Sequence, residues 1–259
     1  MLTANIQLTM KVLVIDIGGT NVKVASTDMR VPIKIPSGPT MDAAKMAEDV
    51  LAATEGWDYD CISIGYPGPV THERPLSEPH NLAPGWIDFP YKKVLGKPIR
   101  FINDAAMQAL GGYKGGRMLF LGTGTGLGSA MIFDGVVVPL ELAHLPYKKG
   151  RTYEEWIGLA GLQRQGKKRW RKSVIDIIER LQAALVCDSV LLGGGNAKLM
   201  KNLPVHVILG ANSNAIDGGI KLWQDATVPE PPAVQVTKNP AKRRRASYKL
   251  KSTSAKKKK

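Results

Sequence analysis

The chain has 259 residues, of which 44% are hydrophobic and 6% aromatic, and its formal net charge is +14. This length allows one or two domains with substantial cores, and the absence of an apolar run of about 20 residues excludes a membrane-spanning helix. The opening residues lack the basic and apolar regions of a secretory signal. Two cysteines, Cys61 and Cys187, are too few for a disulfide scaffold or a four-cysteine zinc site. We therefore expect a cytoplasmic enzyme or binding protein with no membrane partner.

Most of the positive charge is gathered at the end of the chain. Residues 238–259 hold eleven basic residues and no acidic one, with no apolar periodicity. Such a segment is predicted to be a disordered tail. Tails of this kind bind nucleic acid non-specifically by neutralising phosphates, and a solvated tail without a partner is the other interpretation.

A second basic excess lies inside the predicted folded body. Residues 148–172 hold nine basic residues and only Glu154 and Glu155 as acids. The rest of the body carries a small negative net charge. We therefore expect one basic patch on an otherwise acidic surface.

The first half of the chain alternates strands with helices. The apolar runs predict strands, and the spacing of apolar residues in 41–54 and 105–113 predicts helices. The predicted strands are 11–19, 21–27, 31–36, 61–69 and 97–104.

The second half repeats this order, which indicates a duplication. Its predicted strands are 117–126, 127–135, 136–142, 188–196 and 205–211, and its predicted helices are 153–187 and 212–224. In the first of these helices Val174, Ile177, Ile178, Leu181 and Leu185 share one face. The predicted organisation is an α/β lobe over 1–114, a second over 115–227, and a proline-rich exit with the basic tail over 228–259. Glycine turns that face one another in two related lobes suggest a nucleotide or phosphate cleft between them.

Asp16 ends the first strand, and the turn Gly18-Gly19-Thr20-Asn21 follows at once. The glycines allow backbone N–H groups to approach a phosphate, and Thr20 and Asn21 add side-chain donors. Lys23 adds a positive charge. An ordinary hairpin also uses glycines, so this turn alone leaves both interpretations open.

A second turn of the same kind, Gly122 to Gly128, occupies the equivalent place in the second half. Within it Gly124, Thr125 and Gly126 are the candidate phosphate contacts. Neither turn matches the Walker loop or the dinucleotide fingerprint, because no Gly-Lys-Ser/Thr is present and no helix follows at once. Two such turns in a duplicated chain favour phosphate binding.

Two further groups of polar residues could carry chemistry. Asp104 follows Asn103 at the end of a strand and suits a general base that takes a proton from a sugar hydroxyl, or it is the N-cap of the next helix. Glu141, His144 and Glu154 could contact several hydroxyls of one sugar ring, although His144 could equally be a core histidine.

These motifs occur in an order that resembles the ROK sugar kinases, and among them the polyphosphate glucokinases. The resemblance covers nearly the whole body, from residue 12 to residue 224. The matching pieces are DIGGTNVK (16–23), IGYPGPV (64–70), NLAPGW (81–86), IND (102–104), GTGLGSAMIFDG (124–135), ELAHLP (141–146), GLAGLQRQGKKRW (158–170) and LLGGG (191–195).

The resemblance implies a fold and a role for each matching position. The fold is two duplicated ribonuclease-H-like lobes, as in the actin-like ATPases, with a cleft between them. Asp104 would be the catalytic base, and Asp16 would lie near Mg²⁺, through water. The glycine turns would clamp phosphates, and Gly194 and Gly195 would form part of the turn on the adenosine side. The implied sugar contacts are Gly68, Asn81, Asn103, Glu141, His144 and Glu154.

Two departures from the family pattern are visible. Most ROK proteins follow the Glu…His motif with a cysteine-rich zinc site, but no cysteine lies between Cys61 and Cys187, so no structural zinc is expected. The polyphosphate glucokinases share that lack. Ala143 stands where the family usually has glycine, which bears on the sugar preference.

The implied activity is transfer of a phosphoryl group from polyphosphate, ATP or both to the 6-hydroxyl of glucose, in a homodimer. The alternatives are an ATP-only kinase for another hexose and a non-catalytic protein that binds sugar or polyphosphate. ROK repressors carry a helix-turn-helix ahead of the sugar lobe, for which the residues before Asp16 leave no room.

A basic helix over 164–172 is the candidate contact for a long polyphosphate donor. Arg164, Lys168 and Lys172 are spaced to lie along one helical face, and Lys167 and Arg171 form a neighbouring row. Like charges so spaced destabilise a helix, which suggests a polyanionic partner. A solvated basic helix is the other interpretation.

Overall fold

The computed structural model describes residues 10–224. The predictions for the proline-rich exit and the basic tail lie outside these residues. Within them, no helix is long and apolar enough to cross a membrane.

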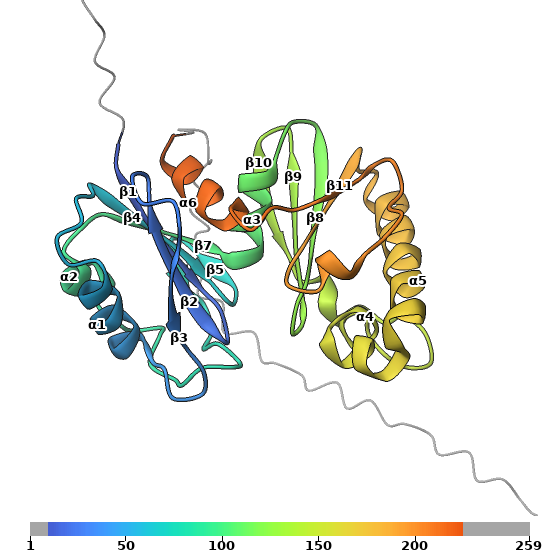
Figure 1. Ribbon diagram of the computed structural model, residues 1–259, viewed down its shortest axis with the longest axis horizontal. Helices are drawn as coiled ribbons and strands as arrows, with labels where there is room; N and C mark the ends of the chain where they lie inside the picture. The colour runs from blue at the N-terminus through green and yellow to red at the C-terminus, as the bar shows by residue number, and fades with distance from the viewer. Residues whose placement is uncertain (1–9, 225–259) are drawn as a thin grey trace, which may run out of the picture. The chain divides into compact units, whose positions relative to one another are not determined.

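Two five-stranded sheets with the same strand order form the framework (Figure 1). The first runs β3-β2-β1-β4-β7 and the second β10-β9-β8-β11-β12. The strands of the first are β1 (Val12–Ile17), β2 (Asn21–Ser26), β3 (Ile33–Pro36), β4 (Cys61–Tyr66) and β7 (Ile99–Asn103), and those of the second are β8 (Arg117–Thr123), β9 (Leu127–Phe133), β10 (Val136–Leu140), β11 (Ser189–Gly193) and β12 (Val207–Leu209). In each sheet the first three strands are antiparallel and the last two run parallel to the first. The predicted duplication is confirmed.

The predicted helices are present as α1 (Ala43–Ala53), α3 (Asp104–Gly112), α4 (Tyr153–Ile157), α5 (Leu159–Leu185) and α6 (Asn214–Gln224). The sequence did not indicate the helix α2 (Tyr91–Leu95), the small hairpin of β5 (Val70–Thr71) and β6 (Arg74–Pro75), or the short 3₁₀ helices Leu142–His144 and Ala197–Leu199. These elements are too short to have a readable periodicity.

Strand β1 is buried on both faces. Because its side chains point alternately to the two faces of the first sheet, they contribute to two separate hydrophobic cores. Leu13, Ile15 and Ile17 pack with α1 and α2. Val12 and Val14 point the other way, into a core that also holds α3, α6 and residues of the second sheet. Asp16 shares this second face by alternation, so the strand aims its carboxylate toward α3.

Helix α5 covers the other face of the second sheet (Figure 1). Val174, Ile177, Ile178 and Leu181 are buried there, and Leu185 packs partly buried at the edge of the same cluster. The predicted apolar face of this helix is confirmed.

Helix α6 belongs to the second half of the sequence but packs against the first sheet. Ser63 on β4 donates to the carbonyl oxygen of Gly219 at 2.6 Å and accepts from the indole of Trp223 at 2.9 Å. The division of the chain at 114 and 115 stays a prediction.

Helices α3 and α6 approach closely at glycines. A Cβ atom at Gly218 would lie 1.8 Å from the carbonyl oxygen of Met107, and one at Gly111 would lie 1.8 Å from the carbonyl oxygen of Asn214. Only glycine allows backbones this near each other. Because Asp104 is the first residue of α3, this crossing also fixes where Asp104 lies.

We predict that Gly218→Ala destabilises the protein by about 2 kcal/mol or more, because the new methyl group must push the two helices apart. The measurement is chemical or thermal unfolding. Gly195→Ala is the matched control, since a Cβ atom there meets nothing within 4 Å. Equal unfolding midpoints for the two variants would contradict the close crossing.

Candidate active site

The parallel strands of the first sheet bring their polar ends to one edge. Asp16 on β1 is in register with Gly65 on β4, and Tyr66 is in register with Asn103 on β7. Asp16 is only 4% exposed. Its Oδ2 accepts a hydrogen bond from Lys23 Nζ at 2.8 Å, so the buried carboxylate is paired with a cation.

Asn103, and not Asp104, is the N-cap of α3. Its Oδ1 accepts from the backbone N–H of Ala106 at 3.1 Å, and its Nδ2 donates to the carbonyl oxygen of Gly68 at 3.1 Å. The interpretation of Asp104 as the helix cap is therefore wrong. The carboxylate of Asp104 is therefore not engaged as the cap of α3.

The carboxyl group of Asp104 holds its proton far more strongly than an ordinary aspartate. Burial, together with the nearby carboxylates of Asp16 and Glu141, raises its pKa to about 7. A 2.7 Å hydrogen bond from the N–H of Ala105, together with the positive charge of Lys23, acts in the opposite direction. The charges of Asp16, Glu141 and Lys23 thus lie close enough to act on Asp104, and the roles of the four residues stay predictions.

The first glycine turn is closed by two hydrogen bonds to the backbone of Gly18. Gly18 donates to the carbonyl oxygen of Asn21 at 3.1 Å, and the hydroxyl of Ser37 donates to the carbonyl oxygen of Gly18 at 2.6 Å. Gly19 and Thr20 are exposed at the tip. A Cβ atom at Gly19 would lie 3.2 Å from the Cβ of Asn81, so a predicted sugar contact lies beside a predicted phosphate contact.

The second glycine turn is held to the turn that follows β11. Gly124 donates to the carbonyl oxygen of Gly126 at 3.1 Å and accepts from the amide of Asn196 at 3.0 Å. Gly194 has φ of +82°, and a Cβ atom there would lie 2.4 Å from the carbonyl oxygen of Thr123. The structure therefore brings the predicted adenosine-side turn, with Gly194 and Gly195, next to the second phosphate turn. Asn196, which the sequence analysis did not single out, is the residue that joins them.

The second turn also lies near Asp104. A Cβ atom at Gly128, just after the turn, would lie 3.0 Å from the Cβ of Ala105, the neighbour of Asp104. The second sheet thus places its glycine turn close to the start of α3.

The three polar residues of the segment 141–157 have different surroundings. Glu141 and His144 are exposed at the two ends of the 3₁₀ helix Leu142–His144, with Ala143 buried between them. Glu154 is half-buried, and its Oε2 accepts from the N–H of Leu127 at 3.0 Å. Glu154 therefore supports the second glycine turn directly, a contact that the sequence did not indicate. Its contact with a sugar remains a prediction.

The basic stripe on α5 differs from its prediction. Gly166 has φ of +71° and ψ of 157°, so α5 is two helices joined at a kink. The kink separates Arg164 from Lys168 and Lys172, and the expected single line of three is wrong. Two of the five residues also bind their own chain: Arg164 donates to the carbonyl oxygen of Glu155 at 2.5 Å and Arg171 to that of Leu199 at 2.5 Å. Lys167, Lys168 and Lys172 are exposed.

No protein-family model matches this chain, but similar proteins of known type exist. The polyphosphate glucokinase of Mycobacterium tuberculosis is 27% identical over 205 residues, which cover 70% of this chain and 76% of the relative. The crystal structure of the inorganic polyphosphate/ATP-glucomannokinase from Arthrobacter sp. strain KM aligns with a TM-score of 0.69 at 23% identity, over 83% of this chain and 99% of that one.

A ROK family glucokinase from Streptomyces griseus, solved in complex with glucose and AMPPNP, aligns with a TM-score of 0.65 at 18% identity, over 83% of this chain and 100% of that one. The chain has the fold of the ROK sugar kinases. The predicted resemblance to this family, and within it to the polyphosphate glucokinases, is confirmed. In this fold Asp16, Asn103 and Asp104 lie at the edge where the glycine turns and α3 come together.

We predict that Asp104→Asn raises thermal stability relative to the wild type by an amount that depends on pH. A carboxyl with a folded pKa of about 7 and an ordinary pKa when unfolded binds its proton more tightly in the folded state. Wild-type stability therefore falls as pH rises from about 4 to about 7, and the asparagine variant does not share this fall.

The measurement is the melting temperature of both proteins from pH 4 to pH 8. The difference between them should grow up to pH 7 and then stay constant. Asp88→Asn, at an exposed position, is the control and should give a flat difference. A flat difference for Asp104→Asn as well would contradict the raised pKa.

Proposed function

We propose that this chain is a kinase that transfers a phosphoryl group from polyphosphate, ATP or both to the 6-hydroxyl of glucose. The observation that carries the proposal is Asp104: a carboxyl relieved of helix capping, with a pKa of about 7, at the edge where the glycine turns lie. The names of the similar proteins support the same reaction.

Asp104 acts as the general base. A base is most effective when its pKa is near the working pH, because it is then both deprotonated in part and basic enough to take a proton. Asp104 meets this condition through burial and the repulsion of Asp16 and Glu141. It accepts the proton of the sugar hydroxyl as the oxygen attacks the terminal phosphorus of the donor.

The two glycine turns hold the donor phosphates. Their backbone N–H groups and the side chains of Thr20, Asn21 and Thr125 supply donors, and Lys23 supplies positive charge. In this kind of transfer most of the catalytic effect comes from positioning and from stabilising charge on the phosphoryl oxygens. Gly194 and Gly195 lie on the nucleotide side when ATP is the donor.

Asp16 fits the requirements of a magnesium contact. Mg²⁺ in phosphoryl-transfer sites is held by one or two carboxylates, by phosphate oxygens and by several waters, so a single carboxylate beside a phosphate turn is sufficient. Among residues 10–224 no group of three or more histidine, cysteine, aspartate or glutamate side chains is arranged to hold a metal. The ion would neutralise charge on the donor phosphates.

The sugar lies against residues from both halves of the chain: Gly68, Asn81, Asn103, Glu141, His144 and Glu154. Several of these are fixed by contacts of their own, such as Asn103 by Ala106 and Glu154 by Leu127. Pre-oriented polar groups discriminate strongly against sugars that lack a hydroxyl.

A kinase for a different hexose is the second candidate. Ala143 is buried between Glu141 and His144, where its methyl group influences how both side chains are presented. The similar Arthrobacter enzyme is named a glucomannokinase. A homodimer and a cytoplasmic location remain predictions.

The test is a panel of donors and sugars, with product detected as sugar 6-phosphate. We predict turnover with glucose and with at least one of ATP and polyphosphate. Asp104→Asn should lose about 10²- to 10⁴-fold in kcat while still binding glucose, as expected for loss of a general base. Asp88→Asn serves again as the control. Near wild-type turnover by Asp104→Asn would exclude Asp104 as the base.

The exposed lysines of α5 give a separate prediction about the donor. Reversing Lys168 and Lys172 to Glu should raise KM for long polyphosphate at least tenfold and KM for ATP much less, because only the long polymer extends beyond the glycine turns. The effect should shrink in high salt, where charges are screened over a few ångströms. The matched control is reversal of Lys92 and Lys93, two neighbouring exposed lysines on α2. Equal effects on both donors would exclude a polyphosphate contact on α5.

A further inference from the structure

The segment between β10 and α4 carries two of the proposed sugar contacts, yet little regular structure holds it. Glu141 caps a 3₁₀ helix of three residues, and His144 is the last of the three. The chain then makes an irregular turn, closed by hydrogen bonds between Tyr147 and Arg151 at 2.8 Å and between Arg151 and Lys148 at 3.2 Å. A segment of this kind keeps one conformation only when side chains attach it to something rigid.

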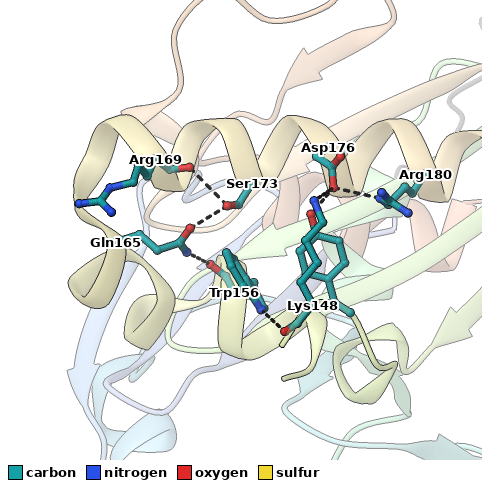
Figure 2. Close-up of polar contacts among 8 residues, drawn as sticks. Lys148, Trp156, Gln165, Arg169, Ser173, Asp176 and Arg180 are labelled. Atoms are coloured by element: carbon teal, nitrogen blue, oxygen red, sulfur yellow. Dashed lines mark hydrogen bonds and ion pairs between the residues drawn. The ribbon is translucent and has the colours of Figure 1, made fainter. Parts of the chain in front are cut away.

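The rigid element is α5, and the attachment is Asp176 (Figure 2). Three side chains donate to its Oδ2: the hydroxyl of Tyr147, the ammonium of Lys148 at 3.0 Å, and the guanidinium of Arg180 at 2.9 Å. Tyr147 and Lys148 belong to the irregular segment, whereas Asp176 and Arg180 belong to the helix. We call these four residues the Asp176 anchor.

Asp176 is well placed for this role because its helix does not move independently of the second sheet. Val174, Ile177 and Ile178, on either side of it in the sequence, are fully buried against that sheet. The three donors hold the pKa of Asp176 at about 2, chiefly through the hydrogen bond from Tyr147. The carboxylate therefore stays charged at every pH at which the protein would work.

Aromatic rings and a second set of hydrogen bonds extend the anchor to α4. The ring of Tyr147 meets that of Trp156 edge-on, with centroids 5.4 Å apart. The indole of Trp156 donates to the carbonyl oxygen of Lys148 at 3.0 Å, and Gln165 donates to that of Trp156 at 2.7 Å (Figure 2). Glu154 on α4, by contrast, is fixed by the hydrogen bond from the N–H of Leu127, so the anchor acts on Glu141 and His144.

The position of Asp176 limits what it contributes to overall stability. Its side chain is 36% exposed, and exposed ion pairs stabilise a fold only slightly. Three donors from two elements on one carboxylate nevertheless restrict the geometry of those elements strongly. The arrangement is suited to setting position more than to holding the fold together.

We propose that Asp176 is a positioning residue for the sugar site: it holds Tyr147 and Lys148 and, through them, sets the orientation of Glu141 and His144. This inference rests on the proposed function for its sugar part.

The first experiment measures the segment directly and does not depend on turnover. Amide hydrogen exchange is compared between the wild type and Asp176→Asn, which keeps the size of the side chain and removes its charge. We expect exchange in residues 141–152 to rise by about tenfold, while the buried part of α5 is unchanged. Asp188→Asn is the matched control, because Asp188 likewise accepts several hydrogen bonds, from Arg117, in another part of the second sheet. Unchanged exchange in 141–152 would overturn the proposal.

The second experiment separates positioning from a general structural defect. For Asp176→Asn we expect KM for the sugar to rise roughly tenfold, a change comparable to the free energy of one charge-assisted hydrogen bond. KM for ATP and the melting temperature should stay nearly unchanged. Asp176→Glu, which restores the charge, should recover most of the affinity. Equal rises in KM for sugar and donor, or failure of Asp176→Glu to rescue, would overturn the proposal.

The two experiments also distinguish this inference from the proposed function. If the wild type neither binds nor phosphorylates any hexose, the proposed function fails and the sugar part of the inference fails with it. Hydrogen exchange would still decide whether Asp176 holds the segment. Faster exchange with unchanged sugar KM would overturn the link between the anchor and the sugar site.

Discussion

The placement of α3 is the constraint on which the rest of the site depends. Its first turn is capped by Asn103, its body lies in a core shared by the two sheets, and its far end crosses α6 at glycines. Each contact removes one way in which the helix could shift. Asp104 is the first residue of this helix, so the same contacts that stabilise the core also fix a carboxylate relative to both glycine turns.

The electrostatics of the site follow from that placement. Asp16 arrives on the inner face of β1 because strand residues alternate, and it is nearly buried. Two carboxyl groups near each other in surroundings poor in water cannot both ionise easily. Lys23 pairs directly with Asp16, and Asp104 is left with the raised pKa. The carboxyl of Asp104 can therefore exchange a proton near neutral pH.

Much of the fold could be predicted from the sequence because its signals are local. Runs such as Val12–Ile17 and the repeated glycine turns identify strands and the duplication, and the 3.6-residue period identifies α1 and the second part of α5. The return of α6 to the first sheet could not be predicted this way, because it depends on which surface Gly219 and Trp223 meet in three dimensions. The choice of Asn103 over Asp104 as the cap is similar, since both residues are good caps and only the end of β7 decides between them.

The kink at Gly166 changes which basic residues of α5 can form a common surface and which ones support the fold. A continuous helix would align Arg164 with Lys168 and Lys172 and would place all five basic residues on one binding surface. With the kink, Arg164 also stacks over Trp156, at 5.6 Å from its ring centre, and Arg171 supports the carbonyl of Leu199. Both arginines therefore act as structural donors, a role suited to a planar group with several N–H donors. Lys167, Lys168 and Lys172 are left facing solvent, where their charges are free for the polyphosphate contact proposed above.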